Sequence, residues 1–191
     1  VTWLKKLNTK KWDKASKVLF SYERDVFVKI SKEIWFSVAI IVVVIIIRTF
    51  IITPAFVNGH SMYPTLHHHD VLLVEKFNKK IERFDIVVIN HEGTMLVKRV
   101  IGLPGEYIEY KDSKLYVNNI EIEEPFTNST TNSFKMDEML DFDKIPRDFY
   151  FVVGDNRENS QDSRVIGFIP ASEIVGKAVF RLFPSPGKID R

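Results

Sequence analysis

The chain has 191 residues, enough for one ordinary domain and an appendage, and its net charge of +2 argues against a nucleic-acid-binding protein. The absence of cysteine excludes disulfides, a thiolate nucleophile and a cysteine-ligated zinc site. Charge is uneven along the chain. Residues 1–33 hold nine Lys and Arg against four Asp and Glu, whereas residues 53–191 hold seventeen against twenty-one. Such asymmetry around an apolar block is typical of a membrane protein.

Residues 1–33 form a polar, basic tail with scattered Trp, Leu, Val and Phe. Some of these apolar residues recur every three or four positions. A partly amphipathic helix on an anionic lipid surface and a loosely ordered tail both fit this pattern.

Residues 34–52 are predicted to form one transmembrane helix. The first 14 of them, residues 34–47, carry no charge, and 19 residues of helix span roughly 28 Å, close to the roughly 30 Å of a hydrocarbon core. A buried strand is rarely so long, and a cleaved signal peptide would have a shorter apolar region followed by a cleavage site. Pro54 is expected to end the helix. Because positive tails stay inside, residues 1–33 should be cytoplasmic and residues 53–191 extracytoplasmic.

Residues 53–191 change to short apolar runs separated by turn residues, which predicts a mainly β domain built on an antiparallel sheet. A polar excursion at about 107–149 predicts a small β flap on that domain. The predicted strands are Val71–Glu75, Asp85–Asn90, Leu96–Ile101, Tyr107–Tyr110, Lys114–Val117, Tyr150–Val153 and Lys177–Leu182.

Ser61 follows an apolar stretch that breaks into a turn marked by Gly59 and Pro64. A serine becomes a nucleophile only when a nearby base takes its proton. His60 is a poor candidate because adjacent side chains of an extended segment point to opposite faces. The consecutive imidazoles of residues 67–69 favour a solvated loop over a metal site.

Lys98 lies in a predicted strand whose alternation places it between Leu96 and Val100 on one face. An ammonium flanked by apolar side chains loses hydration, and this lowers its pKa and favours the neutral amine. Such an amine can act as a general base for Ser61. An edge-strand lysine that reaches out to water explains the same pattern.

Residues 154–164 gather Asp, Asn, Ser and Arg after an apolar strand, as either a solvated loop or a buried polar network. In the second case, Asp155 and Asp162 are expected to pair with Arg99, Arg157 or Arg164.

Three motifs follow one another along the chain: Ser61-Met62-x-Pro64-Thr65-Leu66, Lys98-Arg99-Val100-Ile101-Gly102-x-Pro104-Gly105 and Gly154-Asp155-Asn156-Arg157-x-x-Ser160-x-Asp162-Ser163-Arg164. In sequence and order they resemble the motifs of type I signal peptidases. The single predicted transmembrane helix and the short predicted flap resemble the Gram-positive branch of that family. The resemblance covers roughly residues 35–183 and implies a cofactor-free Ser/Lys endopeptidase at the outer face of a bacterial membrane. Its expected partners are exported preproteins, the lipid bilayer and the secretion translocon, with no nucleic acid and no metal.

The resemblance implies that Ser61 is the nucleophile, Lys98 the general base and Ser160 the residue that orients the lysine. Arg99, Asp155, Asp162 and Arg164 are implied to support the site. Cleavage after small residues, of the Ala-x-Ala type, implies shallow pockets, for which we expect the lining Val57, Met62, Leu66, Leu96 and Val97. Gly59 stands where some members carry a serine that helps the oxyanion hole.

Two other hypotheses compete with the active peptidase. A membrane-anchored adaptor or inactive homologue would bind exported chains without needing both Ser61 and Lys98. A self-cleaving repressor or pilin-transfer peptidase fits poorly. The N-terminal third consists of a basic tail and an apolar segment, and no helix-turn-helix pattern precedes the β domain.

Overall fold

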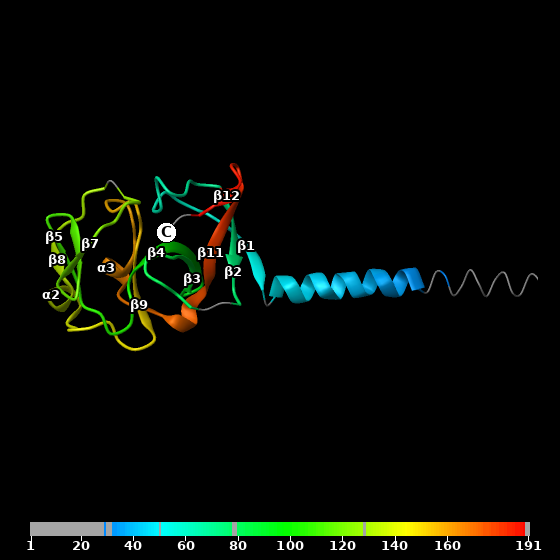
Figure 1. Ribbon diagram of the computed structural model, residues 1–191, viewed down its shortest axis with the longest axis horizontal. Coiled ribbons are helices and arrows are strands. Elements are labelled where there is room, and N and C mark those ends of the chain that lie inside the picture. The colour runs from blue at the N-terminus through cyan, green and yellow to red at the C-terminus, as the bar shows by residue number, and fades with distance from the viewer. Residues whose placement is uncertain (1–28, 30–31, 50, 78–79, 128, 190–191) are drawn as a thin grey trace, which may run out of the picture. The chain divides into compact units, whose positions relative to one another are not determined.

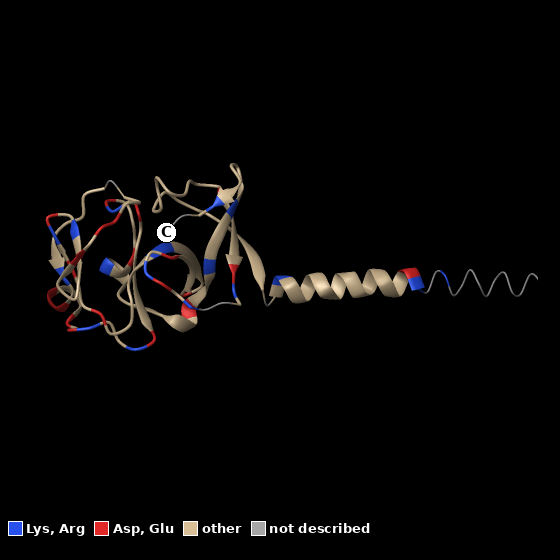
Figure 2. Cartoon of the chain, viewed as in Figure 1, with Lys and Arg blue, Asp and Glu red and all other residues tan. Residues whose placement is uncertain are grey.

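The structure is a computed structural model, and it describes residues 29, 32–49, 51–77, 80–127 and 129–189. The chain divides into two compact units, residues 1–48 and 49–191. Residues 32–49 form a helix, which includes the last residues of the first unit, and their side chains are exposed. Figure 2 shows charged residues only at the ends of this helix. Within the described ranges, no helix combines the length and apolarity of a membrane span. The predicted basic tail falls almost wholly outside the described residues.

The second unit is built on two antiparallel sheets (Figure 1). The larger has the strand order β1-β2-β11-β3-β4-β9-β10, with β12 paired to β11. The smaller has the order β7-β6-β5-β8. The strands are β1 Ile52–Phe56, β2 Val71–Glu75, β3 Ile86–His91, β4 Thr94–Gly102, β5 Ile108–Lys111, β6 Lys114–Val117, β7 Ile120–Ile122, β8 Phe134–Lys135, β9 Phe149–Val153, β10 Ile169–Pro170, β11 Ile174–Phe183 and β12 Gly187–Lys188. The short helices are α2 Met136–Leu140, α3 Ser163–Ile166 and the 3-10 turn η1 Ala171–Glu173.

The mainly β, antiparallel fold predicted from the sequence is confirmed. The predicted apolar helix, however, ends earlier than residue 52, because Ile52 is the first residue of β1 and pairs with Glu75. Pro54 lies inside β1 and does not terminate a helix. A proline has no N–H to donate, and β1 tolerates it because this strand is at the edge of the sheet.

Three hairpins close on two-residue turns. Both turn residues have positive φ in Glu92-Gly93, Asp112-Ser113 and Asn118-Asn119. This conformation matches the right-handed twist of paired strands. The last two turns build the β5-β6-β7 meander, and the first joins β3 to β4, the strand that carries Lys98.

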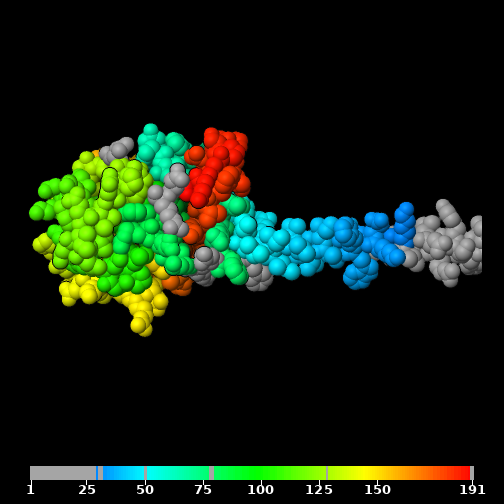
Figure 3. Space-filling view, viewed as in Figure 1, coloured from blue at the N-terminus to red at the C-terminus, as the bar shows by residue number. Residues whose placement is uncertain are grey.

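Three apolar clusters form the interior. One lies between the small sheet and β9 and includes Tyr110 and Phe151. Another is built around Leu72 and Val74 of β2 and holds Met62 and Leu66, which anchor the turn that carries Ser61. The third includes Val87 and Val100, on neighbouring strands β3 and β4. Figure 3 shows the yellow-green residues, which include part of the small sheet, gathered on one part of the surface of the second unit.

Candidate active site

The turn after β1 presents Ser61. Tyr63 N donates to His60 O at 3.2 Å, and Leu66 N donates to Met62 O at 2.9 Å, which closes the chain into a compact turn. Met62 and Leu66 are 2% and 1% exposed, so their burial fixes this turn on the core. The serine is therefore held by apolar neighbours on the turn itself.

Lys98 meets this turn from β4. Lys98 Nζ donates a hydrogen bond to Ser61 Oγ at 2.7 Å, and Lys98 is only 3% exposed. Burial lowers the pKa of Lys98 from 10.5 to about 8. The negative charges of Asp162 and Asp155 oppose this shift, whereas the positive charge of Arg164 adds to it. A lysine in this state deprotonates at a pH where its amine can accept the serine proton.

The loop after β9 holds the Ser61 turn from the other side. Asn156 N donates to Ser61 O at 3.0 Å, and Asn156 Nδ2 donates to His60 O at 3.1 Å. Gly154 also packs here, since an added Cβ would collide with Ser61 O and Ser160 Oγ. A side chain at position 154 would therefore push the Ser61 turn away.

Beneath the loop lies a buried ion pair. Arg99 Nε and Nη2 each donate to a different oxygen of the Asp155 carboxylate, both at 2.8 Å. Thr65 Oγ1 donates to Asp155 Oδ2 at 2.5 Å, and Arg99 Nη1 donates to Phe84 O at 2.9 Å. Because Arg99 directly follows Lys98, this pair joins the lysine strand to the loop and to the Ser61 turn.

Asp162 organises the far end of the same loop. It accepts hydrogen bonds from Gly154 N at 3.0 Å and from Arg164 Nε and Nη2 at 2.8 Å. Burial raises the pKa of Asp162, but Arg164, the Gly154 N–H and the Ser160 hydroxyl outweigh it and hold that pKa below its usual value. Asp162 thus stays ionised and faces Lys98 as a fixed negative charge.

A cleft of about 220 Å³ opens over Ser61 and Lys98. One wall comes from the segment after β1 and the other from the N-terminal half of β4, with two amides from the loop after β9. The full lining is Val57, Asn58, Gly59, His60, Ser61, Met62, Met95, Leu96, Val97, Lys98, Asn159 and Gln161.

Comparisons with known proteins decide the family. Residues 30–183 match the family model of signal peptidase, peptidase S26. The chain belongs to this family.

Signal peptidase I S of Bacillus subtilis strain 168 is 40% identical over 162 residues, covering 78% of this chain and 88% of that protein. A signal peptidase I of Bacillus amyloliquefaciens is 43% identical over 163 residues, covering 78% and 84%. A crystal structure of a signal peptidase I from Enterococcus faecalis V583 shows 35% identity and a TM-score of 0.49, covering 52% of this chain and 97% of that chain. The predicted resemblance to type I signal peptidases is confirmed, and the chain is a protease of the signal peptidase I type.

Within this signal peptidase, the structure brings together most of the residues singled out in the sequence. Val57, Met62, Leu96 and Val97 line the cleft. Leu66 is absent from this lining and lies in the core cluster with Met62. Its burial follows from the turn, whose Leu66 N–H bonds back to Met62 O.

Ser160 lies beside the Ser61 turn, since a Cβ added to Gly154 would meet both Ser160 Oγ and Ser61 O. Its expected role in orienting Lys98 stays a prediction. Its Oγ is buried and has no hydrogen-bond partner of ordinary geometry in the described part of the chain. The hydroxyl nevertheless helps to lower the pKa of Asp162. No hydrogen bond to Lys98 is seen.

Sequence reasoning missed two supporting side chains, Thr65 and Asn156. Both stand inside the quoted motifs, but their types alone do not show that one bonds the Asp155 carboxylate and the other the Ser61 turn. In the described ranges, no group of three or more His, Asp or Glu is placed to hold a metal ion.

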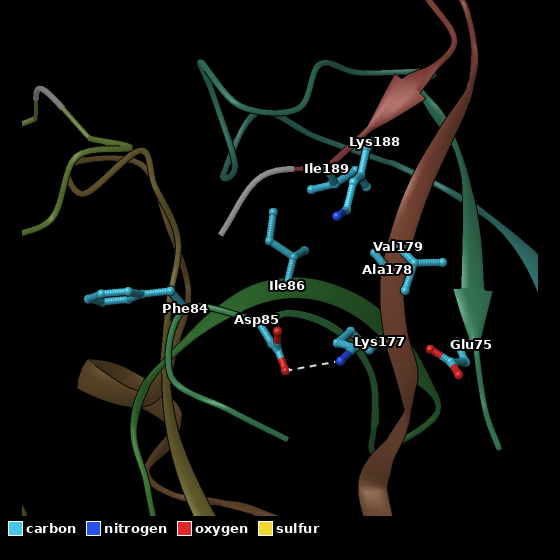
Figure 4. A pocket seen from close by; sticks show the side chains of 9 residues that line it. All are labelled: Glu75, Phe84, Asp85, Ile86, Lys177, Ala178, Val179, Lys188 and Ile189. Atoms are coloured by element: carbon cyan, nitrogen blue, oxygen red, sulfur yellow. Dashed lines mark ion pairs between the residues drawn. The ribbon is translucent and has the colours of Figure 1, made fainter. Parts of the chain in front are cut away.

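A larger pocket of about 420 Å³ lies elsewhere in this unit and shares no lining residue with the cleft. Figure 4 shows Lys177 directed at Asp85, with which it forms a 3.5 Å ion pair, and Lys188 reaching over Ile86. The other residues that line this pocket are Glu75 of β2, Ala178 and Val179 of β11, and Phe84 and Ile189.

Proposed function

We propose that this chain is a membrane-anchored endopeptidase that removes N-terminal signal peptides from exported preproteins by cleaving after small residues. Ser61 is the nucleophile and Lys98 the general base. The observation that carries the proposal is the 2.7 Å contact between Lys98 Nζ and Ser61 Oγ at the floor of a cleft, with the amine buried and its pKa lowered to about 8.

The first half-reaction forms an ester. Ser61 Oγ attacks the carbonyl carbon of the scissile peptide bond while its proton passes to the neutral Lys98 amine. As the C–N bond breaks, the Lys98 ammonium returns that proton to the leaving amine. The departing product is the mature protein with a free N-terminus, and the signal peptide stays bound to Ser61 as an acyl ester.

The second half-reaction consumes water. Lys98, neutral again, takes a proton from a water molecule that attacks the ester carbon. The C–O bond to Ser61 breaks, Lys98 returns the proton to Ser61 Oγ, and the signal peptide leaves with a new carboxyl group. The negative oxygen of both intermediates needs donors, and the Ser61 backbone N–H is the one supplied by the turn itself.

A substrate strand fits between the two walls of the cleft. β4 pairs with β3 along Thr94–Arg99, but its pairing with β9 begins only at Arg99. No described strand pairs with the opposite edge of residues 94–98, so a substrate strand could be added there, and its backbone hydrogen bonds would set the register.

Side chains of an added strand alternate between its two sides, so the first and third residues before the cleaved bond would face the enzyme. The walls there are Val57, Met62 and Leu96, and Val57 and Met62 are almost fully buried. A small cleft with such fixed apolar walls favours alanine over larger side chains, which supports Ala-x-Ala specificity.

Membrane anchoring is proposed from the first unit and from charge. Helical residues 34–47 carry no charge and have exposed apolar side chains, which lipid would cover. The basic residues 1–33 would stay in the cytoplasm, so residues 53–191 would be extracytoplasmic, beside the bilayer and the secretion translocon that deliver the substrate.

The test uses full-length protein in detergent and a purified preprotein. Wild type should release the mature protein with a new N-terminus after an Ala-x-Ala sequence. Ser61→Ala and Lys98→Met should each abolish release while binding the preprotein. Matched controls are Ser172→Ala and Lys111→Met, which change exposed residues outside the cleft. Full activity in Lys98→Met would refute the assigned base, and binding without cleavage by wild type would favour an adaptor.

A further inference from the structure

One wall of the cleft is paired to the turn at residues 67–70. Val57 N donates to Asp70 O at 2.9 Å, and Val57 O accepts from His69 N at 2.9 Å. The next donor along the chain, Gly59 N, bonds to His68 Nδ1 at 3.0 Å. A ring nitrogen therefore takes the place that a backbone carbonyl would occupy in the next rung of this ladder.

This arrangement fixes the direction of the peptide groups around Asn58. In a planar trans peptide, the C=O and the N–H point in opposite directions. Because Gly59 N–H points at His68, Asn58 C=O points away from the turn. Because Val57 C=O faces His69 N, the Asn58 N–H also points away. Neither Asn58 backbone group has a hydrogen-bond partner among the described residues, and Asn58 lines the cleft.

We propose that His68 is a positioning residue that aims the backbone of Asn58 at the substrate strand. The inference rests on the proposed function and adds to it the pairing atoms, Asn58 N–H and C=O. The accepting Nδ1 requires a neutral ring with its proton on Nε2. The neighbouring rings of His60 and His69, at centroid distances of 5.6 Å and 3.7 Å, pack beside His68. Gly59 contributes a φ of 109°, which side-chain-bearing residues rarely adopt.

A matched pair of variants separates the hydrogen bond from the bulk of the ring. Asparagine places Oδ1 two bonds from Cβ, the same separation as histidine Nδ1, whereas leucine has a similar shape without an acceptor. We expect His68→Leu to raise KM for preprotein cleavage roughly three- to tenfold, the range of one lost hydrogen bond, with kcat nearly unchanged. His68→Asn, which keeps an acceptor at this place, should have a KM close to that of the wild type. His67→Leu, an exposed ring in the same turn, is the control.

Amide hydrogen exchange of Gly59 in the folded full-length protein supplies a readout that needs no catalysis. Exchange should be slow in wild type and His68→Asn and faster in His68→Leu. If His68→Leu does not fold, His68→Gln, whose acceptor is one bond further out, should show the raised KM instead.

The inference is overturned if active enzyme keeps its KM in the variant lacking the acceptor, if leucine and asparagine behave alike, or if kcat falls while KM stays constant. Unaltered Gly59 exchange in His68→Leu also overturns it. A wild-type protein that cleaves no preprotein defeats the proposed function instead, and the exchange rates still report whether the His68 contact exists.

Discussion

The buried position of Lys98 predicts the pH at which peptidase activity fails. Only the neutral amine can take the Ser61 proton, so the acid limb of kcat/KM should have its midpoint at the Lys98 pKa of about 8. At pH 7 about one amine in ten is then neutral, against about one in three thousand for a lysine with the ordinary pKa. Burial thus raises the reactive fraction roughly 300-fold, equivalent to about 3 kcal/mol.

Substitution of Arg164 should shift the midpoint pH of this acid limb while leaving Ser61 and Lys98 themselves unchanged. The positive charge of Arg164 lowers the pKa of Lys98, so Arg164→Gln should raise that pKa. It also leaves the Asp162 carboxylate unpaired, which acts in the same direction. We expect kcat/KM at pH 7 to fall roughly three- to tenfold, with the alkaline plateau retained.

The assay is kcat/KM for preprotein cleavage between about pH 6 and pH 10. Arg147→Gln removes the same charge from an exposed position and should leave the profile unchanged. An identical limb in wild type and Arg164→Gln, or a wild-type profile that is flat across neutral pH, would refute the reasoning.

Three further predictions follow from buried contacts. Lys98 loses its proton near pH 8 in the folded protein but near pH 10.5 in the unfolded chain, so the free energy of unfolding of the wild type should rise with pH between these values. In urea unfolding, the free energy of unfolding of Lys98→Met should therefore exceed that of the wild type by up to about 3 kcal/mol at pH 7, and the two should converge near pH 10.5. Asp155→Leu leaves the Arg99 guanidinium buried without its carboxylate and should cost about 3–5 kcal/mol by the same method, whereas Glu121→Gln in an exposed pair should change little. Gly154→Ala should lower kcat on the order of 100-fold by displacing Ser61, and a variant with normal kcat would contradict that packing.

Strand prediction succeeded where apolar alternation and turn residues agreed. Val71–Glu75 and Lys114–Val117 have the predicted bounds, and the predicted core of β4 lies inside the observed strand. β1 was missed because Ile52 continues an apolar run and Pro54 reads as a helix terminator. Pairing with β2 outweighs both signals, and only tertiary structure reveals it. The two-residue strands β8, β10 and β12 are too short to show any periodicity in the sequence.

The candidate site was predictable in its residue types and motif order but not in its hydrogen bonds. The spacing of these residues does not indicate that Asp155 forms its ion pair with Arg99, or that Arg157 forms one with Glu124 at 2.6 Å. The choice depends on which guanidinium the fold buries beside which carboxylate. The contact between Gly59 and His68 was equally hidden, because three consecutive histidines in a polar turn indicate solvent exposure.

The change in burial along β4 explains how Lys98 can be desolvated and still be accessible from the cleft. Thr94 and Met95 are exposed, burial increases along the strand, and Lys98 is the first buried residue. From Arg99 onward β4 has β9 on its second edge, whereas before Arg99 no strand in the described part of the chain pairs with that edge. Lys98 therefore lies at the junction between a two-sided, desolvated half-strand that lowers its pKa and a one-sided half where we propose that the substrate peptide binds. A lysine further along β4 would be enclosed by β9, and one nearer the hairpin would be hydrated and protonated.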